Sequence, residues 1–388
     1  MKKLLFVFAG LAFALTAAAQ EFRITHGPYL CDMSQDGVTV VWTTNRPALS
    51  WVEASPADSL APAPPPRHYQ TVAGRKLAGR TLHAVRVRGL QPGTDYRYRI
   101  FSQEVQSWPD VNNVTYGKTV GADASRRRAY GFRTFPAAGS GCSFLVLNDI
   151  HGKADYLTRL CKHVDFSELG FVAFNGDMSS SVESGEQLFK DYLDASAALF
   201  AAGTPILFTR GNHETRGVFA DSLGDYFPGQ DGRFYGIYRY GDVCILLLDC
   251  GEDKPDSDIR YYGLSTTDAY REQEARWLKG VVESEEYRSA PLHIVVLHMI
   301  PGGKSSWHGE QELRRLLVPI LNEASVDIML CGHYHRYQWI DDGSRGTNFP
   351  ILVNSNRDKL VVKADRRGID IDVVNTGGEV IKRHRIDK

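Results

Sequence analysis

The sequence has almost no excess of charge of either sign and no long apolar segment. Its 45 Lys and Arg residues nearly balance its 46 Asp and Glu residues. This balance argues against nucleic acid as a partner, because binding to a phosphate backbone requires a strongly basic surface. The apolar run at residues 4–15 is shorter than the roughly 20 residues that a membrane-spanning helix needs. No later run is longer, so we expect no transmembrane segment.

Internal repeats and low-complexity segments are also absent, which excludes repeat architectures. The six cysteines have the spacing of neither a zinc ribbon nor a redox pair. Cys142, Cys244 and Cys331 fall in or beside predicted core strands, where a free thiol packs as a small apolar group. We therefore expect no structural disulfide.

The first residues have the composition of a secretory signal peptide. Lys2 and Lys3 precede the apolar run, and the small residues 17–19 form a cleavage site. We expect a signal peptide at residues 1–19, a mature chain that begins near Gln20, and export to the periplasm or the exterior of a bacterium. No cysteine stands at the cleavage site, which argues against a lipid anchor.

Residues 20–137 have the pattern of a smaller, all-β domain. Alternating apolar and polar residues predict strands at residues 37–44, 50–54 and 83–87. Tyr96 lies in a turn and strand at residues 90–100, where it fits the tyrosine corner of an immunoglobulin-like sandwich. Proline-rich or polar segments predict loops and a linker at residues 61–66, 108–128 and 137–141.

The pattern changes at residue 142, and strands alternate with helices from there to residue 388, which predicts an α/β domain. Helices are expected at residues 154–161, 185–200, 270–282 and 310–323. Closing strands are expected at residues 350–353, 359–364, 369–374 and 380–386.

Five polar clusters in the α/β domain each follow a short apolar run directly. The runs are residues 144–147, 171–174, 205–208, 294–297 and 326–330. The polar residues after them are Asp149 and His151, then Asp177, then Asn212, His213 and Glu214, then His298, and finally His333 and His335. Such runs, bounded by turn residues, are typical of buried strands. Because α/β folds bind ligands where strands end, we expect these side chains to gather at one edge of a sheet.

Carboxylate, imidazole and amide ligands in this number suit a pair of divalent or trivalent metal ions. Two cations about 3.5 Å apart hold a hydroxide in line with a P–O bond and neutralise the phosphoryl oxygens. Asp177 is the candidate bridging ligand, because a carboxylate has two oxygens. Asp149, His151 and one C-terminal histidine are candidates for one metal. Asn212, His298 and the other C-terminal histidine are candidates for the second.

The five motifs, in this order, resemble those of the calcineurin-like metallophosphoesterase superfamily. From residue 21 to 388 the chain resembles purple acid phosphatases and bacterial relatives that have an N-terminal fibronectin-like domain. The resemblance implies a layered β-sandwich flanked by helices at residues 142–388. It also implies two ligand sets. One metal would be bound by Asp149, His151, Asp177 and His335, and the other by Asp177, Asn212, His298 and His333.

The resemblance further implies residues that face the substrate. In the family, the histidine of the Asn-His-Glu motif lies beside the substrate phosphate, which corresponds to His213, with Glu214 as its expected orienting partner. Residues 305–310 resemble a loop whose histidine contacts substrate, which makes His308 the candidate general acid. Arg210 and Arg216 flank the Asn-His-Glu motif. Solvation is the simpler interpretation of both, and Arg216 is the candidate for a contact with phosphate.

One motif departs from the purple acid phosphatases. Their Gly-Asp-x-x-Tyr motif supplies a tyrosinate to ferric iron, whereas Ser180 stands at the tyrosine position here. His151 stands where those enzymes have glycine. An imidazole thus replaces the tyrosinate, which should remove the charge-transfer colour and favour Mn²⁺, Zn²⁺ or Fe²⁺ over Fe³⁺.

The preferred interpretation is a secreted dinuclear phosphoesterase that hydrolyses small phosphomonoesters by in-line attack of a metal-bridging hydroxide. His151 favours an alternative, a phosphodiesterase active on cyclic nucleotides or other diesters. An alternative of another class is a non-catalytic cell-surface binding protein with a vestigial site. The presence of every expected ligand argues against that last alternative.

Overall fold

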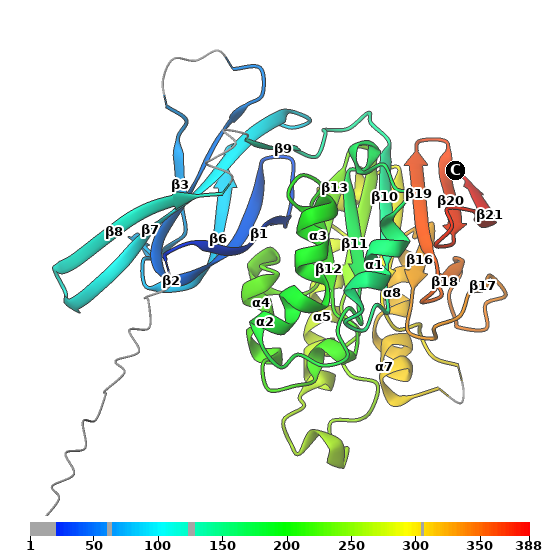
Figure 1. Cartoon of the computed structure of the whole chain (residues 1–388). Coiled ribbons are helices and arrows are strands. Elements are labelled where there is room, and N and C mark those ends of the chain that lie inside the picture. The colour runs from blue at the N-terminus through cyan, green and yellow to red at the C-terminus, as the bar shows by residue number, and fades with distance from the viewer. Residues whose placement is uncertain (1–20, 60–63, 123–128, 304–305) are drawn as a thin grey trace, which may run out of the picture.

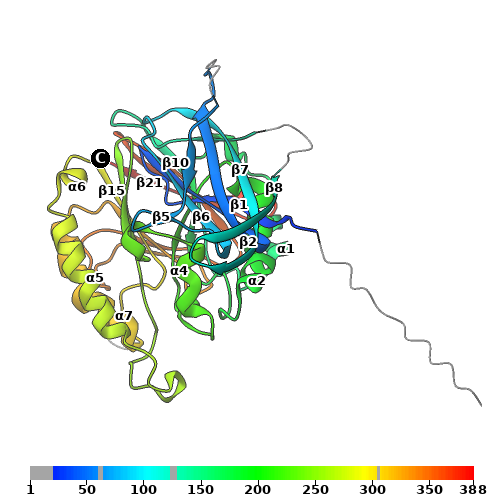
Figure 2. The same ribbon diagram turned by 90° about the vertical axis from the view of Figure 1, so that its left-hand side faces the viewer.

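A computed structural model of the chain describes residues 21–59, 64–122, 129–303 and 306–388. The expected signal peptide lies outside these residues. Within the described residues, no helix combines the length and the apolar character needed to cross a membrane. Figures 1 and 2 show a β-rich N-terminal part beside a larger part in which strands are covered by helices.

The N-terminal part is built around one long strand, β2, Gly37–Pro56. Its other strands are β1 (Ile24–Cys31), β3 (Arg67–Tyr69), β4 (Thr71–Val72), β5 (Arg75–Lys76), β6 (Arg80–Arg88), β7 (Asp95–Asp110), β8 (Asn113–Gly121) and β9 (Tyr130–Arg133). The strands expected at residues 37–44 and 50–54 are both segments of β2. The chain stays extended between the two expected ranges, and its register with β6 shifts between Thr43 and Ala48.

The segment at residues 108–128, expected to be a loop, is largely a β-hairpin. Strand β7 continues to Asp110 and pairs with β8 from Asn113 onward, while residues 123–128 lie outside the described chain. Strand β8 is exposed along most of its length, so it lacks the alternation that would have predicted it. The expected tyrosine corner is confirmed, because the Tyr96 hydroxyl accepts a hydrogen bond of 2.9 Å from the N–H of Gln91.

The larger part contains two stacked sheets. In the first, the parallel strands β10 (Cys142–Leu147), β11 (Phe171–Asn175) and β12 (Ile206–Thr209) continue into the antiparallel strands β19 (Lys359–Asp365), β20 (Gly368–Val374) and β21 (Val380–Asp387). The second has the order β13 (Gly236–Tyr240), β14 (Val243–Leu248), β15 (Leu292–Leu297), β16 (Ile328–Cys331), β18 (Ile351–Val353) and β17 (Gln338–Ile340). Every strand expected from residue 142 onward is confirmed.

Apolar side chains from both sheets form one core between them, including Phe144 and Phe171 from the first sheet and Val296 and Leu330 from the second. Helices cover the outer faces. Those on the first sheet are α1 (Ala154–Cys161), α2 (Gly185–Leu188), α3 (Asp194–Ser196) and α4 (Leu223–Tyr226). Those on the second are α5 (Thr267–Val281), α6 (Glu285–Arg288), α7 (His308–Leu316) and α8 (Val318–Glu323). The expected α/β fold, a layered β-sandwich flanked by helices, is thus confirmed.

Two expected helices differ in detail. The segment at residues 185–200 is helical, but π-helical turns at Phe189–Leu193 and Ala197–Ala201 alternate with α2 and α3. The segment at residues 310–323 is divided into α7 and α8. Pro319 lies in the first turn of α8, because proline has no N–H and its ring clashes with the carbonyl of the preceding turn.

The two parts of the chain are joined by strand pairing and by buried side chains. Strand β1 pairs with β12 at Cys31 and Ile206, so one sheet runs through both parts. The Tyr98 hydroxyl donates to the Ala202 carbonyl at 2.7 Å. The His26 ring stacks on Phe189 with 4.1 Å between ring centres. The pairing of β1 with β12 joins segments on the two sides of the expected domain boundary at residues 137–141. That boundary stays a prediction.

We predict that Tyr98→Phe lowers the free energy of unfolding by about 1–2 kcal/mol, because it leaves the Ala202 carbonyl without its donor. Chemical denaturation measures this. Tyr116→Phe is the matched control, since that side chain is 42% exposed on β8. Equal stability of the two variants would show that the hydrogen bond between the two parts contributes nothing.

Candidate metal centre

The predicted ligands follow the carboxyl ends of strands in both sheets. Asp149 and His151 follow β10, Asp177 follows β11, Asn212 follows β12, His298 follows β15, and His333 and His335 follow β16. The sequence suggested one edge of a single sheet. The structure corrects this, because the ends of two stacked sheets meet at the centre.

The loops that present the ligands have an unusual backbone. Ten described residues other than glycine have a positive φ angle, and five of them are predicted ligands: Asp149, His151, Asp177, His333 and His335, with φ between 52° and 71°. This conformation is uncommon for residues with a side chain and costs on the order of 1–3 kcal/mol each. Such strain persists only where surrounding contacts impose it, and it concentrates at functional sites.

The contacts that impose this conformation join the loops to one another. The N–H of Asp149 donates to the Gly176 carbonyl at 3.0 Å, and the N–H of His151 donates to the Asp177 carbonyl at 2.9 Å. The N–H of His333 donates to Oδ2 of Asp149 at 3.0 Å, which connects the two sheets. Each loop is therefore positioned by its neighbours rather than by its own sequence alone.

Glu214 has a different role from the one expected. Its buried carboxylate accepts hydrogen bonds from the N–H groups of Asp177, Met178, Ser179 and Gly211, at 2.7–3.2 Å. Burial and the nearby Asp177 charge raise the pKa of Glu214 to about 7, against the lowering effect of these N–H groups. The expectation that Glu214 orients the His213 ring is wrong. It holds the loops after β11 and β12 together.

Gly211 permits the close approach of these two loops. A Cβ atom at Gly211 would lie 2.1 Å from Oδ1 of Asp177, and one at Gly176 would lie 2.4 Å from the nitrogen of Gly211. Neither position has room for a side chain. Close packing of the two loops therefore requires glycine both before Asp177 and before Asn212.

Asp177 lies at the middle of the gathered side chains. Its Oδ1 accepts a hydrogen bond of 3.0 Å from the N–H of His213, and its Oδ2 lies 3.1 Å from Nε2 of His298. Three groups have all their potential ligand atoms within 4.8 Å of one another. They are Asp149 with His151 and His335, His151 with Asp177 and His213, and Asp177 with His298 and His333. The carboxylate of Asp177 thus belongs to two of the three groups.

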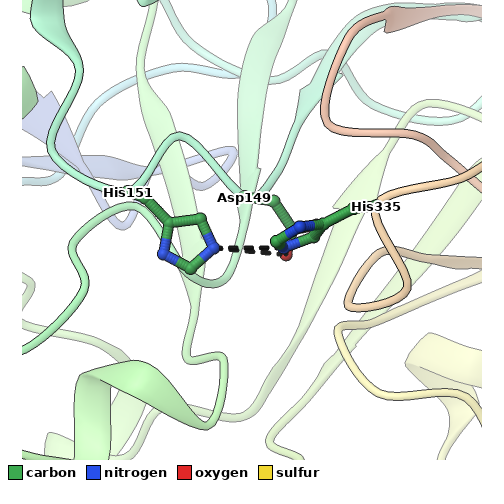
Figure 3. A group of neighbouring side chains, drawn as sticks. All are labelled: Asp149, His151 and His335. Atoms are coloured by element: carbon green, nitrogen blue, oxygen red, sulfur yellow. Dashed lines mark hydrogen bonds and ion pairs between the residues drawn. The ribbon is translucent and has the colours of Figure 1, made fainter.

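Figure 3 shows the first of these groups, in which His151 and His335 point toward each other beside Asp149. Nε2 of His151 lies 3.1 Å from Nε2 of His335, and Nε2 of His335 lies 3.0 Å from Oδ1 of Asp149. The other oxygen of Asp149 accepts from Nδ2 of Asn148 at 2.6 Å. Three lone-pair atoms therefore converge on one point, as a metal ion requires.

Unpaired buried atoms test whether the site fits metal ions. Oδ1 of Asn212 is buried and has no hydrogen-bond partner among the described residues. Oδ1 of Asp149 and Nε2 of His298 are also buried, and their close contacts are with other predicted ligands, Nε2 of His335 at 3.0 Å and Oδ2 of Asp177 at 3.1 Å. Leaving such an atom unpaired costs about 1–3 kcal/mol. Nδ1 of His298 donates to the Asn175 carbonyl at 2.7 Å, which makes Nε2 the nitrogen that would bind a metal once it has lost its proton. These oxygen and nitrogen atoms match the donors that divalent metals prefer.

The negative charges of the buried carboxylates favour a cation at the centre. Burial by itself would lower the pKa of His298, but the carboxylates of Asp177 and Asp149 raise it to about 10. Burial lowers the pKa of His333 to about 4, and the charge of His298 adds to that effect. Two buried carboxylates thus hold a proton on the nearest imidazole, and metal cations would take the place of that proton.

His213 and Arg216 lie together beside the centre. Nδ1 of His213 donates to the Ser180 carbonyl at 2.7 Å, and Nη1 of Arg216 lies 3.4 Å from Nε2 of His213. Arg216 is 30% exposed and forms a two-pronged ion pair with Glu252, at 2.8 and 2.9 Å. The expected solvation of Arg210 is wrong, because its guanidinium pairs with the buried Asp249 at 2.7 Å.

His308 lies apart from the gathered ligands. It is the first residue of α7, and its Nε2 lies 2.9 Å from the Asp268 carboxylate. Among the described residues, it belongs to none of the three potential metal groups. The ring pairs with Asp268, and its expected role as general acid stays a prediction.

Sequence reasoning missed Glu310 and Asn148. Glu310 is fully buried, accepts a hydrogen bond of 2.8 Å from the Tyr334 hydroxyl, and lies 3.9 Å from Nε2 of His333. A single glutamate near a helix start has no distinguishing pattern. Asn148 also accepts from Nδ2 of Asn354 at 2.7 Å, and only its position next to Asp149 in the sequence could have indicated its role.

Comparisons with known proteins agree with this geometry. Residues 142–337 match the model of the calcineurin-like phosphoesterase family. The chain belongs to this family. Residues 30–116 match the N-terminal domain of purple acid phosphatases. The class of enzyme expected from the sequence, a hydrolase of phosphoric ester bonds, agrees with both matches.

Similar proteins include purple acid phosphatases of plants. Purple acid phosphatase 21 of Arabidopsis thaliana is 21% identical over 270 residues, which cover 66% of this chain and 53% of that protein. Purple acid phosphatase 18 of the same plant is 23% identical over 224 residues, with coverage of 55% and 48%. The chain thus spans about half the length of these relatives.

The solved structure of purple acid phosphatase PPD1 from yellow lupin (Lupinus luteus) seeds has the same fold. It superposes with a TM-score of 0.66 and 15% sequence identity, over 93% of this chain and 74% of that chain. At this identity the likeness shows the fold, while the roles of single residues rest on the geometry described above.

Ser180, which stands at the family's tyrosine position, lies beside the histidine that departs from the same pattern. Oγ of Ser180 lies 3.3 Å from Nδ1 of His151. If Nδ1 donates its hydrogen to this hydroxyl, the lone pair of Nε2 points toward Asp149 and His335. The serine therefore fits as an orienting partner of His151 rather than as a ligand.

We predict that Glu214→Gln greatly reduces metal uptake and lowers the free energy of unfolding by about 2 kcal/mol or more. An amide offers one acceptor oxygen instead of two, and its NH₂ would face backbone N–H groups. Metal analysis and chemical denaturation measure the two effects. Glu183→Gln, at an exposed side chain on the adjacent loop, is the control. Normal metal content in Glu214→Gln would contradict the structural role of this carboxylate.

Proposed function

We propose that this protein is a dinuclear metal phosphoesterase whose substrates are small phosphomonoesters. The observation that supports this most strongly is the convergence of predicted ligands from five loops, whose buried donor atoms lie close to one another, with Oδ1 of Asn212 unpaired among the described residues. Membership of the calcineurin-like phosphoesterase family supports the same reaction class. The purple acid phosphatase match of the N-terminal domain supports monoesters over diesters.

The proposed ligand sets combine these groups of side chains with the family resemblance, which supplies Asn212. Asp149, His151, Asp177 and His335 would hold one ion, and Asp177, Asn212, His298 and His333 would hold the other. Asp177 would serve both ions, since its carboxylate belongs to two potential metal groups. Asn212 is a neutral ligand, so its ion would keep more positive charge for the substrate.

Two bound ions would supply a water nucleophile at neutral pH and would neutralise charge on the phosphoryl oxygens. The remaining tasks fall to side chains of the protein. His213 is anchored through Nδ1 to the Ser180 carbonyl, and a proton on its Nε2 would let that nitrogen donate to a phosphoryl oxygen. Arg216 adds positive charge next to this ring while Glu252 keeps its guanidinium in place. We assign no catalytic role to His308.

A phosphodiesterase remains the second candidate, on one observation. The ring of His151 occupies the first ligand group, where the purple acid phosphatases have no histidine. A preference for bis(4-nitrophenyl) phosphate over 4-nitrophenyl phosphate would favour this alternative. Two bound ions without turnover of either ester would favour the binding protein with a vestigial site.

We also propose that the protein is exported. The support is the pattern of two lysines, an apolar run and small residues at positions 17–19. An exported phosphoesterase would act on small phosphorylated molecules outside the cytoplasm.

We predict that the protein supplied with Mn²⁺, Zn²⁺ or Fe²⁺ hydrolyses 4-nitrophenyl phosphate and that a chelator abolishes this activity. Removal of the ions should also lower the melting temperature, because they bind only the folded state. Asp177→Asn should reduce kcat/KM by at least about 100-fold, since it removes the shared ligand. Asp221→Asn, at an exposed residue, is the control. Failure of the wild type to bind any of these ions would refute the proposal.

We predict that the protein loaded with Fe³⁺ has no tyrosinate-to-iron absorption band in the visible spectrum, because Ser180 stands where the family's tyrosine would be. The double variant His151→Gly with Ser180→Tyr should gain such a band. Single His151→Gly is the control, since it removes the imidazole without supplying a phenol. A purple wild-type protein would show that another tyrosine binds the metal and that the proposed ligand set is wrong.

A further inference from the structure

A cleft with a volume of about 840 Å³ opens beside the metal centre. Asp149 and His335, two of the proposed ligands, form part of its wall. The rest of the wall comes from the start of α1, from Lys190 and from Arg357 in the loop after β18. A volume of this size accommodates a small molecule. A substrate phosphoryl group held at the metals would therefore have room for its remaining atoms in this cleft.

The wall of the cleft is strongly basic. It contains Lys153, Arg159, Lys190 and Arg357, whereas Asp155 is its only acidic residue apart from the proposed ligand Asp149. Among the described residues, none of these four cations forms an ion pair with a carboxylate. Arginines on other surfaces do so, for example Arg315 with Glu312 at 2.5 Å and Arg383 with Asp372 at 2.9 Å. The positive charge of the cleft is thus left without internal neutralisation.

Two of these cations, Arg159 and Arg357, lie near Tyr156. The guanidinium of Arg159 lies 5.3 Å from the centre of the Tyr156 ring. Burial and the negative charge of Asp358 raise the pKa of the Tyr156 hydroxyl, and the charges of Arg159 and Arg357 both act to lower it. Lys153 occupies the N-cap position of α1 and provides no side-chain cap. The N–H of Tyr156 donates to the Lys153 carbonyl at 2.8 Å, so among the first three helical residues only the N–H groups of Ala154 and Asp155 are available to an anion.

We propose that this cleft binds a second anionic group of the substrate, so that the preferred substrates are phosphomonoesters with another phosphate, such as sugar bisphosphates. The inference rests on the proposed function, because it assumes that the metals hold the first phosphoryl group. The unpaired cations neutralise the second phosphate, and the shared wall at Asp149 and His335 places both phosphates on one molecule.

A comparison of glucose 1,6-bisphosphate with glucose 1-phosphate and glucose 6-phosphate tests the proposal. We expect kcat/KM to be at least about tenfold higher for the bisphosphate, mainly through a lower KM, because the extra contact is made equally before and during reaction. The double variant Arg159→Gln with Arg357→Gln should lose this preference and keep its activity on 4-nitrophenyl phosphate. Added salt should weaken the preference of the wild type.

Lys162→Gln with Lys279→Gln is the matched control, because it removes two exposed cations from outside the cleft. Loss of the preference in this control would show a general effect of net charge and would overturn the proposal. Equal kcat/KM of the wild type on all three glucose phosphates would also overturn it, as would an unchanged preference in the cleft variant. If no monoester is hydrolysed, 4-nitrophenyl phosphate included, the proposed function fails and this inference fails with it.

Discussion

The Glu214 carboxylate, which accepts hydrogen bonds from the N–H groups of Asp177, Met178, Ser179 and Gly211, is the contact on which the centre depends. It fixes the loop after β11 against the loop after β12 and so sets the position of Asp177. Gly211 allows the approach, since no Cβ fits beside the Asp177 carboxylate. The ligand common to both proposed metal sites is thus positioned by backbone hydrogen bonds beneath it rather than by its own rotamer.

The strained backbone and the negative charge of the centre both indicate that it binds cations. Five predicted ligands have positive φ angles, and the two buried carboxylates raise the pKa of His298 to about 10. Without cations, the folded protein must bear the cost of unpaired lone pairs and of close negative charges. Metal ions would offset these costs, so binding of metal and stability of the loops are expected to be coupled. The basic cleft beside Asp149 would attract an anionic substrate in the same way, because its four cations form no ion pair with a carboxylate among the described residues.

Much of the α/β part could be predicted from the sequence, because buried parallel strands appear as short apolar runs followed by polar residues. Every run before a predicted ligand became a strand. Prediction failed where the signal was weak or misleading. Strand β8 is exposed and shows no alternation, Pro47 lies inside the long strand β2, and π-helical turns interrupt the segment at residues 185–200. The role of Glu214 was also misjudged, because adjacency to His213 in the sequence says nothing about which backbone groups its carboxylate reaches.

The sequence by itself determined which side chains are available for metal binding and where they follow strands, since motif order and hydrophobic periodicity are local properties. Through the resemblance to purple acid phosphatases, it also led us to expect Ser180 and His151 at the positions of that family's tyrosine and glycine. Only the tertiary structure decided that the ligands come from two sheets, that His308 turns to Asp268, and that Lys190 and Arg357 face one cleft. These outcomes depend on contacts between segments that are distant in the sequence, by 40 residues for His308 and Asp268 and by 184 for Asp149 and His333. Such contacts are set by the packing of the sheets rather than by any local pattern.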